Sequence, residues 1–466
     1  MINTSYMGLK YCMKNYCWNF KRLRTYMKIK IIFLLPHNNK WIGGWDRKYD
    51  IYFKNLSNEY FEKYFVEVTN IDTEVDVQGE RVVLTASMIK DFLFEREIQY
   101  IYFAWAKIDK SLQNELTKKY IGLLNINFTP RYDNSWEFIN LIISKTDYRK
   151  LARMHGSLIN SYVVYNPIDV TNWCRLSSEV DGIYRNNFHD KKAIIGRLWR
   201  AEPLKWHFLM IATLVLLQRR KNYSYGFIFA WMPYLYRKVL KVLLHKKMYT
   251  SILFLPELKR LDDIAKFYKS IDIFWQTSRI GESFWNVIAE AFCFKVPVIT
   301  DFKRFYRNGK VIEHIYDAQI ELVDHEINWW YCKYPSKVID FLEQHTLDDI
   351  QVLWYHWYEK VHQLYDVKDT AITLAKILYK IGKEKWFYTI DPCFEQLQQN
   401  PTTEELEQYQ EVYFEKIALC QQTNTLHRMN YYCYMLLNNL WRWVEYLYLL
   451  VRKLAKKYGK KDIESY

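Results

Sequence analysis

The stretch IDIFWQTSRIGESFWNVIAEAFCFKVPVIT, residues 271–300, has the pattern of a strand, a loop, a helix and a second strand. A short apolar run covers residues 271–275, and a second one begins at Pro297. Short apolar runs bounded by loops are typical of buried parallel strands, and the segment between them is long enough for a helix. The stretch therefore predicts a β-α-β unit within a parallel sheet.

Two glutamates lie in the otherwise apolar helical part of this stretch. Glu282 precedes the expected helix, for which Ser283 is a suitable N-cap, and Glu290 lies eight residues after Glu282. Buried carboxylates are rare unless they are paired or hydrogen-bonded. Either both carboxylates face solvent or pair with Arg or Lys, or they hold a ligand, and sugar hydroxyls are donors that suit them.

The start of the same helix is suited to an anion. The first N–H groups of a helix have no intrahelical acceptor and point into the preceding loop. Those of Phe284, Trp285 and Asn286 would face the loop after residue 275, where a phosphate could accept from them.

Short apolar runs alternate with helical patterns along most of the chain, which predicts parallel sheets flanked by helices. Helices are expected over 45–58, 146–155, 208–217, 234–245 and 260–270. The expected strands before the turn at Asn166-Pro167 are Ile29–Leu35, Phe65–Val68, Val82–Leu84, Tyr100–Phe103, Leu141–Ser144 and Tyr162–Tyr165. Those after it are Ala193–Ile195, which ends at Gly196, then Gly226–Ala230, Ser251–Phe254, Ile271–Trp275 and Pro297–Thr300.

The restart of this pattern after residue 167 predicts two successive α/β domains. We expect a basic N-terminal extension over 1–26, a first domain over 27–167, a second over 168–375 and a helical C-terminal extension over 376–466. Two doubly wound domains that face each other form a cleft, and ligands bind where the carboxyl ends of strands point into it.

The composition and charge of the chain limit the classes of partner and the cellular setting that we expect. The chain has 466 residues and a net charge of +14, from 66 Lys and Arg against 52 Asp and Glu, which favours anionic partners. The eight cysteines form no C-x-x-C pair, so a zinc site is not expected and a reducing, cytoplasmic setting fits best. We see neither a run long enough to span a bilayer nor the apolar centre of a signal peptide.

Several segments carry a resemblance to a known family. GESFWNVIAEAFCFKVPVIT, residues 281–300, resembles the donor-site segment of retaining glycosyltransferases of family 4 with the GT-B fold, whose pattern is E-x7-E. IIGRLWRAEPLKW, residues 194–206, resembles the family's G-R-x-x-R…K stretch. YVVYNPIDV, residues 162–170, and the opening IIFLLPH…IGG are similar to its domain-joining turn and first strand with glycine loop.

The resemblance implies roles for individual residues. Arg197, Lys205 and Glu282 would be catalytic, although the pattern leaves open which of Arg197 and Arg200 contacts the diphosphate. Gly43 and Gly44 would form an acceptor or phosphate loop, or a simple turn, while His37 and His155 are candidates for acceptor contacts. The donor-binding residues would be Arg200, Ser283, Phe284, Trp285, Asn286, Val287 and Glu290.

The implied activity is transfer of a sugar from a UDP- or GDP-linked donor to a hydroxyl of a glycan, lipid-linked or protein acceptor, with retention of configuration. The resemblance implies no cofactor and no metal, and no nucleic-acid partner is expected. Trp285 and the Phe294-Lys295 step depart from the family's small residues, which affects the expected donor. The alternative is a non-catalytic, glycosyltransferase-derived scaffold or membrane-surface protein, because the basic, Trp-containing C-terminus suits peripheral membrane contact.

Overall fold

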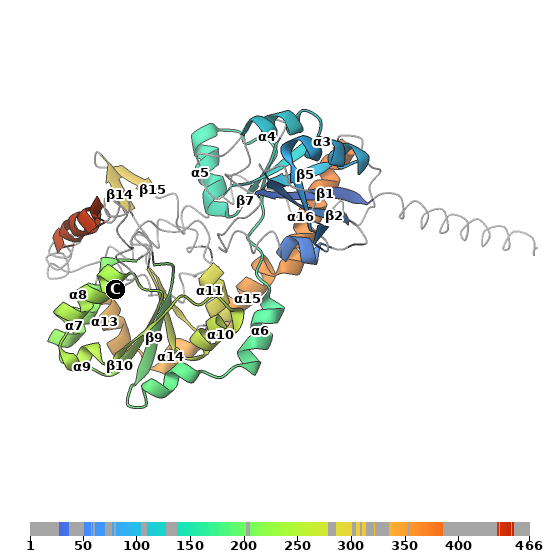
Figure 1. The fold of residues 1–466 in the computed structure, drawn as a ribbon. Helices are drawn as coiled ribbons and strands as arrows, with labels where there is room; N and C mark the ends of the chain where they lie inside the picture. The colour runs from blue at the N-terminus through green and yellow to red at the C-terminus, as the bar shows by residue number, and fades with distance from the viewer. Residues whose placement is uncertain are drawn as a thin grey trace, which may run out of the picture. The chain divides into compact units, whose positions relative to one another are not determined.

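The computed structural model describes residues 28–36, 51–56, 58, 61–69, 77–78, 81–103, 110–126, 138–201, 206–277, 286–300, 304–307, 310–313, 321, 335–352, 354–384, 436–437, 439–448 and 450–451. The chain divides into two compact units. Unit 1 comprises Met1–Ile143, Tyr148–Pro167 and Tyr365–Asn400, and unit 2 comprises Ser144–Asp147, Ile168–Leu364 and Pro401–Tyr466. Each unit has its own sheet, which is wholly parallel in unit 2 and parallel except for one strand pair in unit 1 (Figure 1).

Unit 1 contains an eight-stranded sheet of order β3-β4-β2-β1-β5-β6-β7-β8, in which the β3–β4 pair is antiparallel and the other pairs are parallel. The strands are β1 Ile29–Pro36, β2 Phe61–Thr69, β3 Val77–Gln78, β4 Arg81–Thr85, β5 Tyr100–Phe103, β6 Ile121–Ile126, β7 Phe138–Ile142 and β8 Ser161–Val163. The helices α3 Ala86–Glu95, α4 Lys110–Thr117 and α5 Lys145–His155 follow β4, β5 and β7.

The two faces of this sheet have separate cores, because successive side chains of a strand point to opposite faces. Ile32 and Leu34 pack with residues of α3 and α4, whereas Ile31 and Phe33 pack with residues of α16, Val367–Glu384. The Tyr100 hydroxyl donates to the carbonyl of Leu378 in α16 at 2.7 Å. The structure therefore differs from the predicted domain end at residue 375, which falls inside a single helix that belongs to unit 1.

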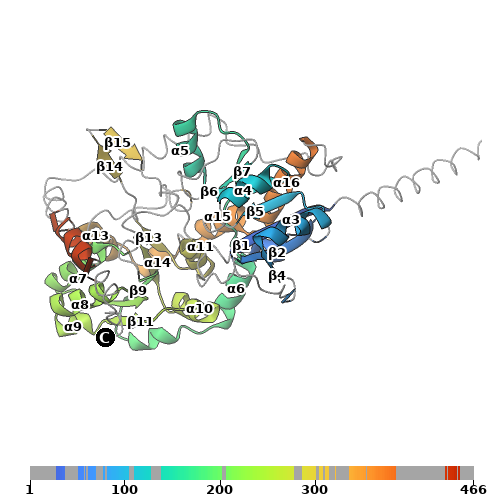
Figure 2. The same cartoon turned by 45° about the horizontal axis from the view of Figure 1, so that its top comes forward.

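Unit 2 contains a five-stranded, wholly parallel sheet of order β11-β10-β9-β12-β13. The strands are β9 Ala193–Leu198, β10 Tyr225–Ala230, β11 Ile252–Leu255, β12 Ile273–Gln276 and β13 Val298–Thr300. One face packs on α7 Phe208–Arg219, α8 Tyr234–Leu243, α9 Lys246–Tyr249 and α13 Pro335–Gln344. Figure 2 shows α10 Leu261–Lys269 and α11 Asn286–Cys293 away from those helices, with α6 Val170–Glu179 in contact with both.

The remaining elements of unit 2 are short or peripheral to the sheet. A 3-10 helix, η2, covers Ile183–Asn187, and the antiparallel hairpin β14 Arg304–Arg307 and β15 Lys310–Glu313 follows β13. The helices α14 Leu347–Gln351 and α15 Trp354–Tyr365 lead from α13 to α16. Helices therefore cover most of the described residues between Pro335 and Glu384.

The strand β9 is longer than the sequence predicted. It continues through Leu198 and does not end at Gly196, so Arg197 lies within a buried strand. A Cβ added at Gly196 would lie 2.5 Å from Cγ2 of Ile271, so this strand approaches the C-terminal end of α10 too closely for any side chain. The glycine at this position is therefore required by packing and not by a turn.

The C-terminal helix, which the structure describes at residues 436–437, 439–448 and 450–451, belongs to unit 2. Trp441 stacks on Phe208 with ring centroids 5.5 Å apart, and it contacts the edge of Tyr236 at 5.1 Å. The buried carboxylate of Glu445 accepts from the Tyr236 hydroxyl at 2.5 Å and from Trp441 Nε1 at 2.8 Å. Over the described ranges, we find no helix with both the length and the apolarity to cross a bilayer.

Candidate functional site

The strand order of unit 2 defines where a ligand would bind. From β9 the chain proceeds outward to β10 and β11, and it then returns to β12 on the other side of β9. At such a switch point the loops after the two neighbouring strands leave on opposite faces, so a crevice opens at their carboxyl ends. Gly196 pairs with Phe274, and Arg197 and Gln276 therefore lie at this end of the β9–β12 pair.

Arg197 is fully buried at the switch point. Its guanidinium donates to the backbone carbonyls of Trp275, at 3.0 Å, and of Thr277. Its Cζ lies 4.9 Å from the ring centroid of Trp206, a cation–π contact in a buried setting. Arg197 thus holds the carboxyl end of β12 against β9, which is a positioning role that the sequence did not indicate.

The loop between β9 and α7 is closed by Trp206. Its indole Nε1 donates to the carbonyl of Arg200 at 2.8 Å, which brings the two ends of the loop together. The next residue, His207, is the N-cap of α7, and its Nδ1 accepts from the N–H of Leu209 at 3.0 Å. Arg200 is half-buried in this loop, and Lys205 lies outside the described residues.

Glu290 is buried in α11, as its apolar surroundings indicate, with 7% of its surface exposed. The hydroxyl of Tyr268, from α10, lies 3.2 Å from Glu290 Oε2 and 3.0 Å from the carbonyl of Val287. A buried carboxylate that accepts a hydrogen bond avoids the cost of an unpaired one. The protein therefore supplies a partner to Glu290 before any ligand binds.

The other predicted residues of the β12–α11 segment are placed only in part. Asn286 and Val287 are the first two residues of α11, and both are half-buried. Because α11 follows β12, its start lies on the side of the carboxyl ends of the unit 2 strands. Glu282, Ser283, Phe284 and Trp285 lie outside the described residues, so the expected N-cap is not tested.

Buried polar atoms that the sequence reasoning missed follow the apolar part of β12. Gln276 and Thr277 are both fully buried, and among the described residues neither the Gln276 amide nor the Thr277 hydroxyl has a hydrogen-bond partner. The Oδ1 atom of Asn286 is also buried and has no hydrogen-bond partner among the described residues. Such groups cost about 1–3 kcal/mol each if they stay unpaired. The signal was present in the sequence, because the apolar run IFW, residues 273–275, is followed directly by the polar pair QT.

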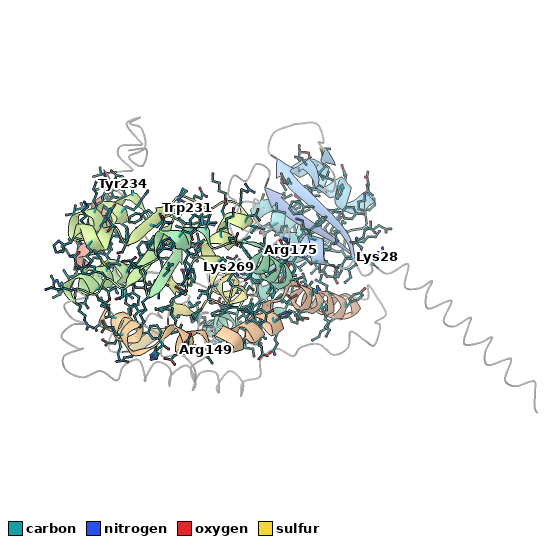
Figure 3. The ribbon with its side chains drawn as sticks, turned by 90° about the horizontal axis from the view of Figure 1, so that it is seen from below. Lys28, Arg149, Arg175, Trp231, Tyr234 and Lys269 are labelled. Carbon is teal, nitrogen blue, oxygen red and sulfur yellow. The ribbon has the colours of Figure 1, made fainter. Side chains whose placement is uncertain are left out.

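Two residues at opposite edges of this sheet, Trp231 at the carboxyl edge and Lys295 at the amino edge, have backbone conformations that favour glycine. Lys295, in the turn between α11 and β13, has φ of 61°, and Trp231, directly after β10, has φ of 58°. Trp231 is labelled in Figure 3 together with Tyr234, the first residue of α8. Bulky residues are rarely held in this region unless the surrounding structure imposes it. Lys295 is the position where the resembled family has a small step before the proline.

The remaining candidates, Gly43, Gly44, His37 and His155, belong to unit 1. Gly43, Gly44 and His37 lie outside the described residues, and His155 is an exposed residue at the end of α5. A search of the described part of the chain finds no group of three His, Cys, Asp or Glu side chains arranged for a metal ion.

Comparison with known proteins reveals similarity in structure but not in sequence. No protein-family model matches the chain, and no curated protein matches it. HepE from Anabaena, solved in complex with UDP and glucose, is 14% identical, with 77% of this chain and 100% of HepE covered at a TM-score of 0.52. A glycosyltransferase from Rickettsia africae is 14% identical, with the same coverage and a TM-score of 0.57.

A third solved structure is similar over the same extent. Sucrose-phosphate synthase from Thermosynechococcus elongatus is 10% identical, with 77% of this chain and 100% of the synthase covered at a TM-score of 0.55. At these identities the similarity shows the fold alone. The chain has the α/β GT-B fold, with two Rossmann-like units, as the sequence predicted.

Proposed function

We propose that this protein transfers a sugar from a nucleotide-diphosphate donor to an acceptor hydroxyl, with retention at the anomeric carbon. The observation that carries the proposal is the switch point of unit 2, where Arg197, buried Gln276 and Thr277 and the start of α11 meet at the carboxyl ends of β9 and β12. Solved structures with this fold include HepE in complex with UDP-glucose and a UDP-forming trehalose-phosphate synthase in complex with glucose-6-phosphate. Those complexes favour a UDP-linked donor, and GDP is the alternative.

The diphosphate is bound by positive charge and by a helix start. Arg200 and Lys205, from the loop after β9, neutralise the departing diphosphate, while the first N–H groups of α11 donate to its oxygens. Arg197 keeps the end of β12 in place through its bonds to Trp275 and Thr277. Stabilising the charge that develops on the leaving group is what accelerates the reaction.

The two glutamates orient the rest of the donor. Glu290 exchanges its bond from Tyr268 for bonds from the ribose hydroxyls, and Glu282 accepts from hydroxyls of the sugar. The bond from the anomeric carbon to the β-phosphate oxygen breaks, and the acceptor oxygen forms the new bond on the same face. The acceptor's proton passes to the departing phosphate, so no protein nucleophile and no cofactor are needed.

Nucleotide binding is the first test. The melting temperature is measured with UDP, GDP, UDP-glucose and GDP-mannose, and release of free nucleotide from the sugar donors is followed in parallel. We expect one base to raise the melting temperature, and we expect Glu290→Ala and Lys205→Ala to abolish that rise. Lys246→Ala, an exposed lysine on α9, is the matched control and should respond as the unchanged protein does. No response to any nucleotide would overturn the proposal.

The stereochemistry is tested separately. The product formed with the active donor is examined by proton NMR, in which the anomeric coupling distinguishes the two configurations. Retention gives a product with the donor's anomeric configuration. An inverted product would leave sugar transfer standing but would refute the retaining mechanism.

A further inference from the structure

The C-terminal helix has an apolar side that faces away from the body of unit 2. Its inner side is fixed by Trp441 and Glu445, which contact Tyr236 of α8 and Phe208 of α7. On the outer side Leu436 is 71% exposed, Leu440 62% and Trp443 68%. The other exposed apolar or aromatic residues of this helix are Leu437, Val444, Tyr446, Leu447, Leu450 and Val451.

The width of this apolar side distinguishes between a second helix and a membrane surface as its partner. Residues 436, 440, 443, 447 and 450 recur at helical spacing and form its centre, with Leu437, Val444 and Val451 along one flank and Tyr446 along the other. A two-stranded helical seam is narrower and is usually flanked by charged residues. A broad apolar side that includes Trp and Tyr is typical of helices that lie in a membrane interface.

The charges around the helix favour an anionic surface. Residues 234–249, which form α8 and α9, contain five Lys and Arg and no Asp or Glu. Arg237, Lys238 and Lys241 of α8 are exposed, as is Arg442 of the C-terminal helix itself. Residues 452–461, which follow the helix in the chain, contain six further Lys and Arg and again no acid. A second copy of the chain would bring the same positive charges opposite one another, whereas anionic lipid headgroups would attract them.

From these observations we infer that the helix 436–451 docks unit 2 on the surface of an anionic lipid bilayer. Leu440, Trp443 and Leu447 enter the boundary between headgroups and acyl chains, and the basic residues contact the headgroups. The helix stays on the membrane surface, since its inner side remains bound to α7 and α8 through Trp441. This inference does not depend on sugar transfer, and its test uses no nucleotide.

The test measures vesicle binding by the full-length protein. Co-sedimentation is compared between vesicles of phosphatidylcholine alone and vesicles that also contain about 30% phosphatidylserine. We expect binding to the mixed vesicles, and a loss of about tenfold or more when salt is raised to roughly 0.5 M, because salt screens the headgroup attraction. The triple variant Leu440→Gln, Trp443→Gln, Leu447→Gln should bind at least about tenfold more weakly at either salt concentration.

A matched control and two further measurements keep the inference falsifiable. Phe94→Gln replaces a residue that is 78% exposed on α3 of unit 1, and it should leave vesicle binding unchanged. The triple variant should keep its melting temperature, because the three side chains are already exposed. A fall of several degrees would mean that another segment of this chain covers the helix, and loss of a dimer in gel filtration would mean that a second copy does. Either result, or unchanged vesicle binding by the triple variant, overturns the inference.

Discussion

In both units the chain builds the sheet outward from its first strand and then returns to the other side of that strand. The two sheets differ in the residues at this switch point. In unit 1 the central pair β1 and β5 ends in buried apolar residues, with Leu34 opposite Phe103. In unit 2 the corresponding pair, β9 and β12, ends in Arg197 and Gln276, both fully buried. Topology places a crevice at both points, but only residue chemistry decides what it does. Among the described residues, the switch point thus has buried polar groups in unit 2 and an apolar sheet end in unit 1.

The largest effect should come from Arg197. Replacing it with Met removes the donors to the carbonyls of Trp275 and Thr277, and bonds from a charged donor contribute about 1.5–3 kcal/mol each. We therefore expect a loss of roughly 3–5 kcal/mol in the free energy of unfolding, measured by urea denaturation. Leu34→Met, at the switch point of unit 1, should cost less than about 1.5 kcal/mol. Equal losses would remove the distinction between the two sheet ends.

A smaller loss is expected at the glycines inside the strands. Gly196→Ala places a Cβ 2.5 Å from Ile271, and Gly122→Ala in unit 1 places one 2.7 Å from the Phe138 ring. Such overpacking typically costs about 1–3 kcal/mol, so thermal unfolding should show a loss in both. The double change Gly196→Ala with Ile271→Ala should lose less than the sum of its single changes, because the clash is removed. Simple additivity would show that the close approach is not the cause.

Gln276 should show opposite effects on stability and on nucleotide binding. Gln276→Leu removes two buried polar atoms that have no partner among the described residues, so the free energy of unfolding should rise by about 1 kcal/mol. If those atoms bind the donor, the rise of the melting temperature with nucleotide should shrink in the same variant. Lower stability with an unchanged nucleotide response would assign the amide a purely structural role.

The smallest effect concerns alkaline pH. Burial, and to a smaller extent the charge of Glu343, raise the pKa of Tyr225 to about 12. Because this pKa lies above that of an exposed tyrosine, about 10, the stability from Tyr225 is complete below pH 10. It is lost as pH rises to about 12, where unfolding leaves the phenolate in water. Urea denaturation at several alkaline pH values should therefore show a shallower decline in Tyr225→Phe.

Tyr225 of unit 2 makes a hydrogen bond that has a counterpart at Tyr100 of unit 1. Tyr225 begins β10 and donates to the carbonyl of Leu342 in α13 at 2.6 Å, as Tyr100 begins β5 and donates to Leu378 in α16 at 2.7 Å. Each hydroxyl joins a strand to a helix from the C-terminal half of the chain. Tyr100→Phe in unit 1 and Tyr225→Phe in unit 2 should therefore each lower the free energy of unfolding by about 1 kcal/mol.

Most parallel strands were predictable because both faces of each sheet are covered, which makes such a strand a continuous apolar run. The strand β6, Ile121–Ile126, was not among the expected strands. The extension of β9 through Arg197 was not predictable, because a charged residue normally marks the end of such a run. Its guanidinium is tolerated there through acceptors on β12, which are 78 and 80 residues away in the chain. The return of α16 to unit 1 also escaped prediction, since helical periodicity does not reveal which core the apolar side joins.

The candidate site was predicted in part for similar reasons. The burial of Glu290 followed from its apolar neighbours, but its partner Tyr268 belongs to another helix and no spacing rule connects them. The polar pair of Gln276 and Thr277 was visible in the sequence, yet its meaning depends on β12 lying beside β9.

Lys295 shows that a turn in the left-handed region can form around a residue larger than glycine. Its turn has φ of 61°, in the left-handed region that glycine adopts most easily. The backbone nevertheless makes the turn and delivers β13 to its position in the sheet. A comparison of coordinates therefore finds the same fold in solved structures that are only 10–14% identical, whereas no protein-family model matches the sequence.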